Sequence, residues 1–187
     1  LSSIDGMVSW DGSRVNVEPV FMVDRVDASI GNVRFNGSVV VNGEVGDGYE
    51  IHAEKDVTLA MSVGRVVIEA GGNVTISGGI LGQHKGVITA GGDIRAKFVQ
   101  DARIEAKGAV IVDDYILNSE VTASGPVLTK ASTAWMGGST VSSECWIYAH
   151  TIGIESACID TTLIVGHNPK LIEERDRLAE EVVEKLK

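Results

Sequence analysis

The chain has 187 residues, of which 44% are hydrophobic and 5% aromatic, with 22 glycines and 3 prolines. This content excludes a wholly disordered chain and requires a core of aliphatic residues and alanine. The 26 acidic residues outnumber the 16 basic ones, and the net charge of −10 disfavours nucleic acids and anionic membrane surfaces as partners. We find no apolar run of the roughly 20 residues that span a bilayer, no signal-peptide pattern and only two cysteines, so we expect a reduced, cytoplasmic protein. Because it begins at Leu1, we expect a piece of a longer chain.

Residues 1–31 lack the repeat that follows them. Asp11-Gly12 lies between two strand-like runs, which is typical of a β-hairpin turn. Pro19 in the second run indicates an edge strand. We predict a β-hairpin cap here, or the remnant of a preceding domain, because a rod of stacked coils must cover its first unpaired strand.

A short repeat accounts for residues 32–167. In it an aliphatic residue is followed by a small residue two positions on, usually a glycine four positions on and another aliphatic six positions on. The clearest copies cover 68–76, 88–96, 104–112 and 121–127. With weaker copies, the starts are Val33, Ile51, Ile68, Ile88, Ile104, Val121, Val141 and Ile159, which are 16–20 residues apart.

This repeat predicts a coiled, all-β architecture. Alternation within each copy indicates a strand with one inward face. The interval is too short for a crossover helix, so each coil must lay its strand parallel to the one before. We therefore predict a single-stranded parallel β-helix (β-solenoid) of about eight coils, roughly 38 Å long at about 4.8 Å per coil. Glycines at its corners are expected to use positive φ.

The handedness of the coil is open to two interpretations. Coils of irregular length favour a right-handed parallel β-helix. Aliphatic residues six apart, as from Val33 to Val63, are instead typical of the left-handed hexapeptide helix of acyltransferases.

Residues 168–187 predict a C-terminal helix. Asn168-Pro169 has the types preferred at the N-cap and the first helical position. Its apolar stripe marks either a helix folded back over the last coil or the start of a coiled coil that joins copies of the chain. The residues of this candidate oligomerisation helix are Leu171, Ile172, Leu178, Ala179, Val182, Val183 and Leu186.

Searches for familiar motifs find no phosphate-binding loop, nucleophile elbow or zinc motif. We therefore predict no catalytic residue, no cofactor and no metal site. His84 lies in a long turn and is either an exposed turn residue or the base of an acyltransferase. The other histidines, without a metal-ligand spacing, are His52, His150 and His167.

Three acids raise the alternative of a carbohydrate-active β-helix enzyme, because such enzymes use paired carboxylates. They are Asp101, Asp113 and Asp114. Asp113 and Asp114 are adjacent and so point to opposite faces of a strand, which does not suit joint catalysis or calcium binding. The rings that a sugar cleft would need are scattered in the sequence: Trp10, Tyr115, Trp135 and Trp146.

Both cysteines are expected to be inert. Cys145 takes the place of the repeat's glycine, which we interpret as a buried, inward position, and Cys158 adjoins the inward Ile159.

Several segments resemble, in the same order, the bacterial flagellar assembly protein A family: 31–39 (GNVRFNGSV), 78–82 (GGILG), 97–102 (KFVQDA), 116–121 (ILNSEV), 137–141 (GGSTV) and 165–169 (VGHNP). The resemblance implies a right-handed β-solenoid between an N-terminal domain and a C-terminal coiled coil, in a bacterial cytoplasmic protein linked to flagellar assembly. It supplies no catalytic residue. Trp135-Met136 departs from the pattern, because a Gly/Lys-rich turn is expected there.

We interpret the chain as a non-enzymatic scaffold, a rod that binds protein partners or associates with itself through its ends or its C-terminal helix. Flagellar assembly or polar organisation is the process that the resemblance implies. The alternatives are the carbohydrate-active enzyme and a hexapeptide acyltransferase, which would be a left-handed trimer with His84 in a cleft between subunits.

Overall fold

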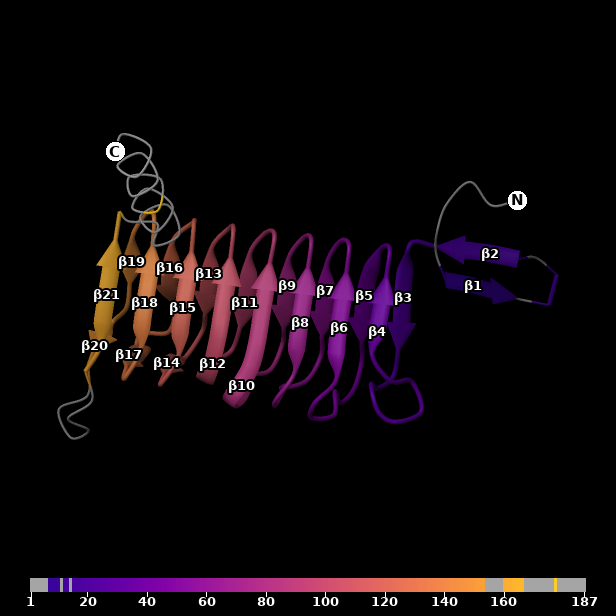
Figure 1. Ribbon diagram of the computed structural model, residues 1–187, viewed down its shortest axis with the longest axis horizontal. Coiled ribbons are helices and arrows are strands. Elements are labelled where there is room, and N and C mark those ends of the chain that lie inside the picture. The colour runs from indigo at the N-terminus through magenta and orange to yellow at the C-terminus, as the bar shows by residue number, and fades with distance from the viewer. Residues whose placement is uncertain (1–6, 11, 14, 154–159, 167–176, 178–187) are drawn as a thin grey trace, which may run out of the picture.

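The computed structural model describes residues 7–10, 12–13, 15–153, 160–166 and 177. From β3 (Val20–Val23) onward the strands stack coil beside coil into an elongated rod (Figure 1). Each strand of the rod pairs in parallel with its equivalent in the next coil. The all-β parallel β-solenoid predicted from the repeat is confirmed.

Each full coil has three sides. Side 1 contains eight strands: β4 (Val33–Phe35), β6 (Glu50–Ala53), β8 (Val67–Ala70), β10 (Ile80–Ala90), β12 (Val99–Ala106), β15 (Glu120–Ala123), β18 (Thr140–Ser143) and β21 (Thr162–Val165). Side 2 also contains eight: β3, β5 (Ser38–Val41), β7 (Val57–Leu59), β9 (Val74–Ile76), β11 (Ile94–Ala96), β13 (Val110–Val112), β16 (Val127–Thr129) and β19 (Ile147–Tyr148). The predicted number of about eight coils is thus confirmed.

Side 3 is the short side. It begins as the isolated bridges Val26↔Val45 and Val63↔Ile80 and continues through the first residues of β10 and β12. It then uses β14 (Tyr115–Leu117), β17 (Trp135–Gly137) and β20 (Thr151–Ile152). The segment at Trp135-Met136 is therefore a strand, whereas the family pattern led us to expect a turn.

Inward residues stack in columns and fill the rod. On side 1 the first column holds the first seven predicted starts, all buried: Val33, Ile51, Ile68, Ile88, Ile104, Val121 and Val141. A second column of small side chains lies beside it: Ala53, Ala70, Ala90, Ala106, Ala123 and Ser143. Burial stabilises each large aliphatic by about 1.5–3 kcal/mol, and each coil shares that burial with its neighbours.

The corner glycines between sides 1 and 2 are required for a reason other than the one we expected. The N–H of Gly125 donates to the carbonyl of Gly108 at 2.9 Å, and that of Gly108 donates to Gly92 at 2.9 Å. A Cβ added at Gly125 would lie 2.7 Å from the carbonyl carbon of Gly108. Close approach of successive coils, and not positive φ, excludes a side chain in this column.

The N-terminal prediction is correct for the hairpin but not for its role. Strands β1 (Met7–Trp10) and β2 (Val15–Glu18) pair antiparallel around the predicted turn. They form a separate two-stranded sheet beyond the end of the rod (Figure 1), and among the described residues they pair with no rod strand. The structure does not support a cap, and β3 of the rod starts at Val20, inside the segment 1–31.

The last coil also differs from the prediction. Leu163, not Ile159, is the residue that pairs with Val141, because the chain between β20 and β21 is longer than in the preceding coils. The predicted C-terminal helix over 168–187, with its stripe from Leu171 to Leu186, lies outside the described residues except for Arg177.

Candidate functional site

A groove of about 830 Å³ lies on side 1. It runs from Arg34 in β4 to Ser142 in β18 and Glu144 just after it, and so crosses seven successive strands. Five of these strands, β6, β8, β10, β12 and β15, end in alanine, and the next residue is Gly71 after β8 and Gly91 after β10. The groove is hollowed at these positions because the small residues place no large side chain over the strand ends.

The strand wall of the groove is a column of outward side chains, one per coil. The parallel register aligns Arg34 with His52, His52 with Glu69, and so on along the rod. In chain order the column is Arg34, His52, Glu69, Thr89, Glu105, Thr122 and Ser142. This wall is polar throughout and carries two glutamates, Glu69 and Glu105, beside Arg34 and His52.

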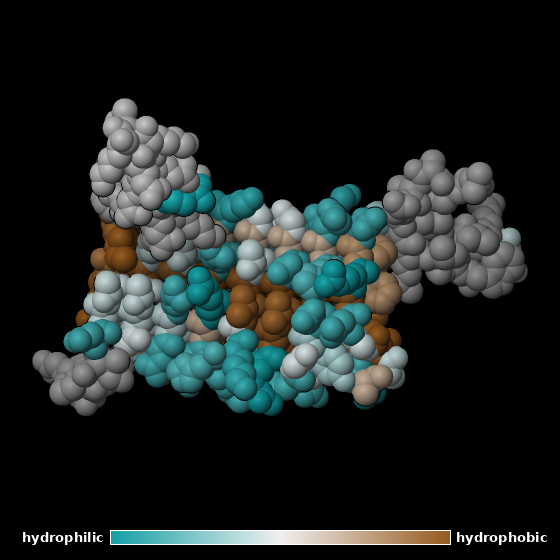
Figure 2. Space-filling model, viewed as in Figure 1, coloured by the Kyte–Doolittle hydropathy of each residue, from teal (hydrophilic) through white to brown (hydrophobic). Residues whose placement is uncertain are grey.

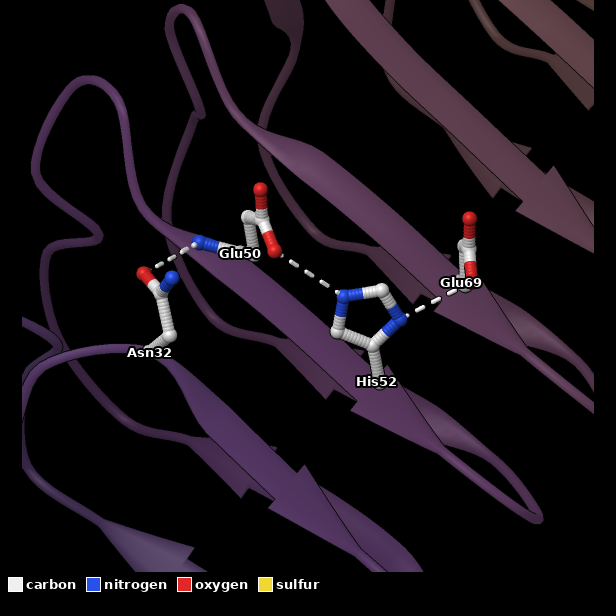
Figure 3. Close-up of polar contacts among 4 residues, drawn as sticks. All are labelled: Asn32, Glu50, His52 and Glu69. Atoms are coloured by element: carbon white, nitrogen blue, oxygen red, sulfur yellow. Dashed lines mark hydrogen bonds and ion pairs between the residues drawn. The ribbon is translucent and has the colours of Figure 1, made fainter.

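His52 is held between two carboxylates (Figure 3). Its Nδ1 lies 2.9 Å from Oε2 of Glu69 on the next coil, and its Nε2 lies 3.2 Å from Oε2 of Glu50 on its own strand. The backbone N–H of Glu50 in turn donates to Oδ1 of Asn32 at 3.1 Å. The arrangement fixes the orientation of Glu69, whose side chain is 58% exposed, at the groove wall.

The middle of the same face is apolar. Val67 and Val87 point outward from β8 and β10, pair directly and are half-buried. Figure 2 shows an apolar patch near the middle of this face with hydrophilic surface on both sides. One flank includes Arg103, whose Nη1 lies 3.4 Å from Oε2 of Glu120. An apolar centre with a charged rim is the usual composition of a protein-binding surface.

The three candidate acids do not share a site. Asp101 lies at the corner between sides 3 and 1, where its φ is 50°. Asp113 and Asp114 lie at the corner between sides 2 and 3, and Asp114 N donates to Lys97 O. One strand of side 3 separates these corners, which is roughly 13 Å for four residues at about 3.3 Å each. Paired glycosidase carboxylates are about 5–10 Å apart, so this geometry does not favour the carbohydrate-active hypothesis.

The predicted turn residue His84 is exposed, with a φ of 60°. Its Nε2 lies 3.5 Å from Oδ1 of Asp101 on the next coil, and the Asp101 carboxylate also accepts from Gln100 Nε2 at 3.2 Å. His84 lies within β10, in the irregular stretch between Leu81 and Gly86, and not in a turn as predicted. The pair is therefore a contact between this exposed stretch and a neighbouring corner.

Two of the rings that seemed scattered in the sequence are neighbours in the rod. The ring centroids of Phe98 and Tyr115 are 5.1 Å apart, those of Tyr115 and Trp135 are 5.2 Å apart, and both pairs are nearly parallel. Each ring packs against the next, so we interpret the stack as part of the packing between coils on side 3. Trp146 is half-exposed just before β19 and makes no described contact with this stack.

Cys145 is exposed, so the prediction of a buried thiol is wrong. It lies at the corner between sides 1 and 2, where the series of backbone hydrogen bonds between corner glycines (the glycine ladder) ends. Cys145 N donates to Ser143 Oγ at 3.1 Å in place of a backbone carbonyl. Cys158 and His167 lie outside the described residues.

The carboxylate of Asp47 links two coils near the β4 end of the rod. Asp47 Oδ1 accepts from the backbone N–H of Arg65 at 2.9 Å, and its Oδ2 accepts from Nε and Nη2 of Arg65 at 3.1 and 3.0 Å. These hydrogen bonds, the backbone one first, lower the pKa of Asp47 from its ordinary value.

Two further findings concern the described part of the chain alone. Among those residues, no three histidine, cysteine, aspartate or glutamate side chains are grouped to hold a metal ion. Nor does that part contain a helix with the length and apolar character needed to cross a bilayer.

The comparisons with known proteins bear on the rod as a whole. The family model described as the Flagellar Assembly Protein A beta solenoid domain matches residues 19–187. The chain belongs to this family. Searches of curated proteins and of solved structures gave no match. The resemblance seen in the sequence is confirmed, and the matched range begins one residue before strand β3 of the rod.

The groove and the cluster at His52 were missed by sequence reasoning, although a signal for the cluster was present. His52 and Glu69 each follow a predicted start of the repeat, at Ile51 and Ile68, by one residue. Aligning the copies therefore places them side by side on the outer face. The groove has no such signal, because it depends on how the corners bend.

Proposed function

We propose that this chain is the rigid, non-enzymatic scaffold of a bacterial flagellar assembly protein, and that it acts by binding other proteins along its length. Membership of the flagellar family supports a structural role. The observation that carries the proposal is the continuous groove across seven strands of one face, with a polar side chain from each strand along one wall. A catalytic pocket gathers a few groups at one point, whereas this groove repeats similar groups once per coil.

The separation of the candidate acids supports the non-enzymatic part of the proposal. Asp101 and Asp114 lie at different corners, and His84 is exposed rather than enclosed in a cleft. The family name supports flagellar assembly as the process. We propose a cytoplasmic location for the protein.

We also infer a right-handed coil. In Figure 1 the strands of side 1 face the viewer and run upward, those of side 2 lie behind and run downward, and the chain advances from right to left. This combination supports right-handed winding, and it argues against the left-handed acyltransferase scaffold.

Self-association belongs to the same proposal. Rod ends present strand edges, and the apolar stripe of residues 168–187 has the spacing of a coiled coil. We propose that this helix, through Leu171, Ile172, Leu178, Ala179, Val182, Val183 and Leu186, joins copies of the protein.

Light scattering of the full-length protein tests the assembly. We expect a discrete oligomer for the wild type and for Glu181→Gln, a control on the polar face, and a monomer for the double variant Leu178→Glu, Val182→Glu. A wild-type monomer at concentrations near about 100 µM, where interactions of about 5.5 kcal/mol are half-populated, would remove self-association. Crosslinking and affinity purification of the full-length protein from its own cells then tests binding of other proteins along the rod, and recovery of no partner would contradict the scaffold role.

A further inference from the structure

We infer that the groove on side 1 receives an extended, basic peptide segment of a partner protein. This inference rests on the proposed scaffold function and specifies the chemistry of what the scaffold binds.

The dimensions of the groove select an extended segment. Seven strands are separated by six steps of about 4.8 Å, which gives a length of roughly 29 Å. Spread over that length, the volume of about 830 Å³ makes a groove that is long and narrow. A helix with its side chains is about 10–12 Å across and does not fit. An extended chain does, and about nine residues at 3.3 Å each fill the length.

The charges that line the groove select a basic segment. Four glutamates line it, Glu54, Glu69, Glu105 and Glu144, against three basic residues, Arg34, Lys107 and His52, of which His52 already contacts Glu69. Glu54 is exposed and makes no ion pair with another described residue. Lysine or arginine side chains of a bound segment would meet these carboxylates, and the net charge of −10 on the chain would speed their encounter.

A buried hydroxyl group at the end of the groove also points to a ligand. Ser142 is only 3% exposed and lines the groove, yet among the described residues its Oγ has no hydrogen-bond partner. Buried hydroxyls are nearly always hydrogen-bonded, because burial without a partner costs about 1–3 kcal/mol. An extended peptide offers a backbone N–H or carbonyl at regular intervals, and either satisfies a hydroxyl.

Fluorescence anisotropy with a labelled nonapeptide of alternating lysine and alanine tests the inference. We expect saturable binding to the full chain that weakens with added salt, because exposed ion pairs are screened. Glu54→Gln combined with Glu69→Gln should weaken binding about two- to fivefold per charge removed. Ser142→Ala should weaken it further without changing the salt dependence.

The matched control is Glu44→Gln, which removes one exposed carboxylate outside the groove. It should leave binding unchanged. Equal weakening by Glu44→Gln would show attraction to the acidic chain as a whole and would overturn the inference, as would equal binding of an 18-residue helical lysine–alanine peptide. Absence of peptide binding in a protein that still recovers partners from cells would refute this groove assignment and leave the scaffold function standing.

Discussion

The ring of Tyr115 stacks on that of Trp135 in the next coil, with centroids 5.2 Å apart and planes inclined by 10°. Phe98 continues the stack on the other side of Tyr115. All three residues immediately precede an inward residue of side 3, so the parallel register places one ring above another at the spacing of the coils. The stack therefore ties three coils together on the side that has the shortest strands.

Trp135→Ala should destabilise the rod by about 2–3 kcal/mol, because it removes a half-buried ring and one stacking contact. A double-mutant cycle with Tyr115→Ala, measured by urea unfolding, should give a coupling of about 0.5–1.5 kcal/mol. Trp146→Ala is the control, since that ring is half-exposed and outside the stack, and it should cost clearly less. A coupling near zero would show that the rings are neighbours without stabilising each other.

The sequence predicts the inside of this rod better than its outside. Seven of eight predicted starts, from Val33 to Val141, lie in one buried column, because burial imposes the period of two and the length of the coil. Outward positions are free of that constraint. The clusters at His52 and Tyr115 can be predicted only after the repeats of successive coils are aligned with one another. The exposure of Cys145 depends on the bend of a corner.

The ends are less predictable for a related reason. A terminal coil has a neighbour on one side only, so its sequence is less constrained by stacking. The shift from Ile159 to Leu163 is an example, because extra residues between β20 and β21 displace the repeat without disturbing the coils before it.

A side chain in the corner glycine column should be poorly tolerated. Gly125→Ala places a Cβ 2.7 Å from the backbone of Gly108, and because a neighbouring backbone cannot move aside, we expect a loss of about 1–3 kcal/mol. Thermal unfolding measures it. The control is Lys107→Ala, an exposed change at the same corner, which should stay within about 0.5 kcal/mol. If both variants unfold with the wild type, the close approach of the coils is not what excludes a side chain.

The contribution of Asp47 to stability should depend on pH. Hydrogen bonds from Arg65 lower its pKa in the folded chain, so its stabilising effect is complete above the unfolded value of about 3.9 and is lost as the pH falls through the lower folded value. Asp47→Asn should therefore unfold more easily than the wild type at pH 7, and the difference should shrink between about pH 4 and pH 2. Urea midpoints across this range measure it. A difference that stays constant down to pH 2 would show that ionisation of Asp47 is not involved.

Two adjacent serines separate the effect of burial on stability from that of hydrogen bonding. Ser143 is fully buried, and its Oγ accepts from Cys145 N at 3.1 Å and donates to Gly125 O at 2.8 Å, which replaces the glycine ladder where it ends. Ser143→Ala leaves these backbone groups unpaired and should cost about 1–3 kcal/mol. Ser142→Ala removes a buried hydroxyl that has no partner among the described residues, so the stability of the free chain should stay the same or rise. Urea unfolding of both variants gives the comparison. Equal losses would show that the cavity left by the hydroxyl, and not the hydrogen bond, sets the cost.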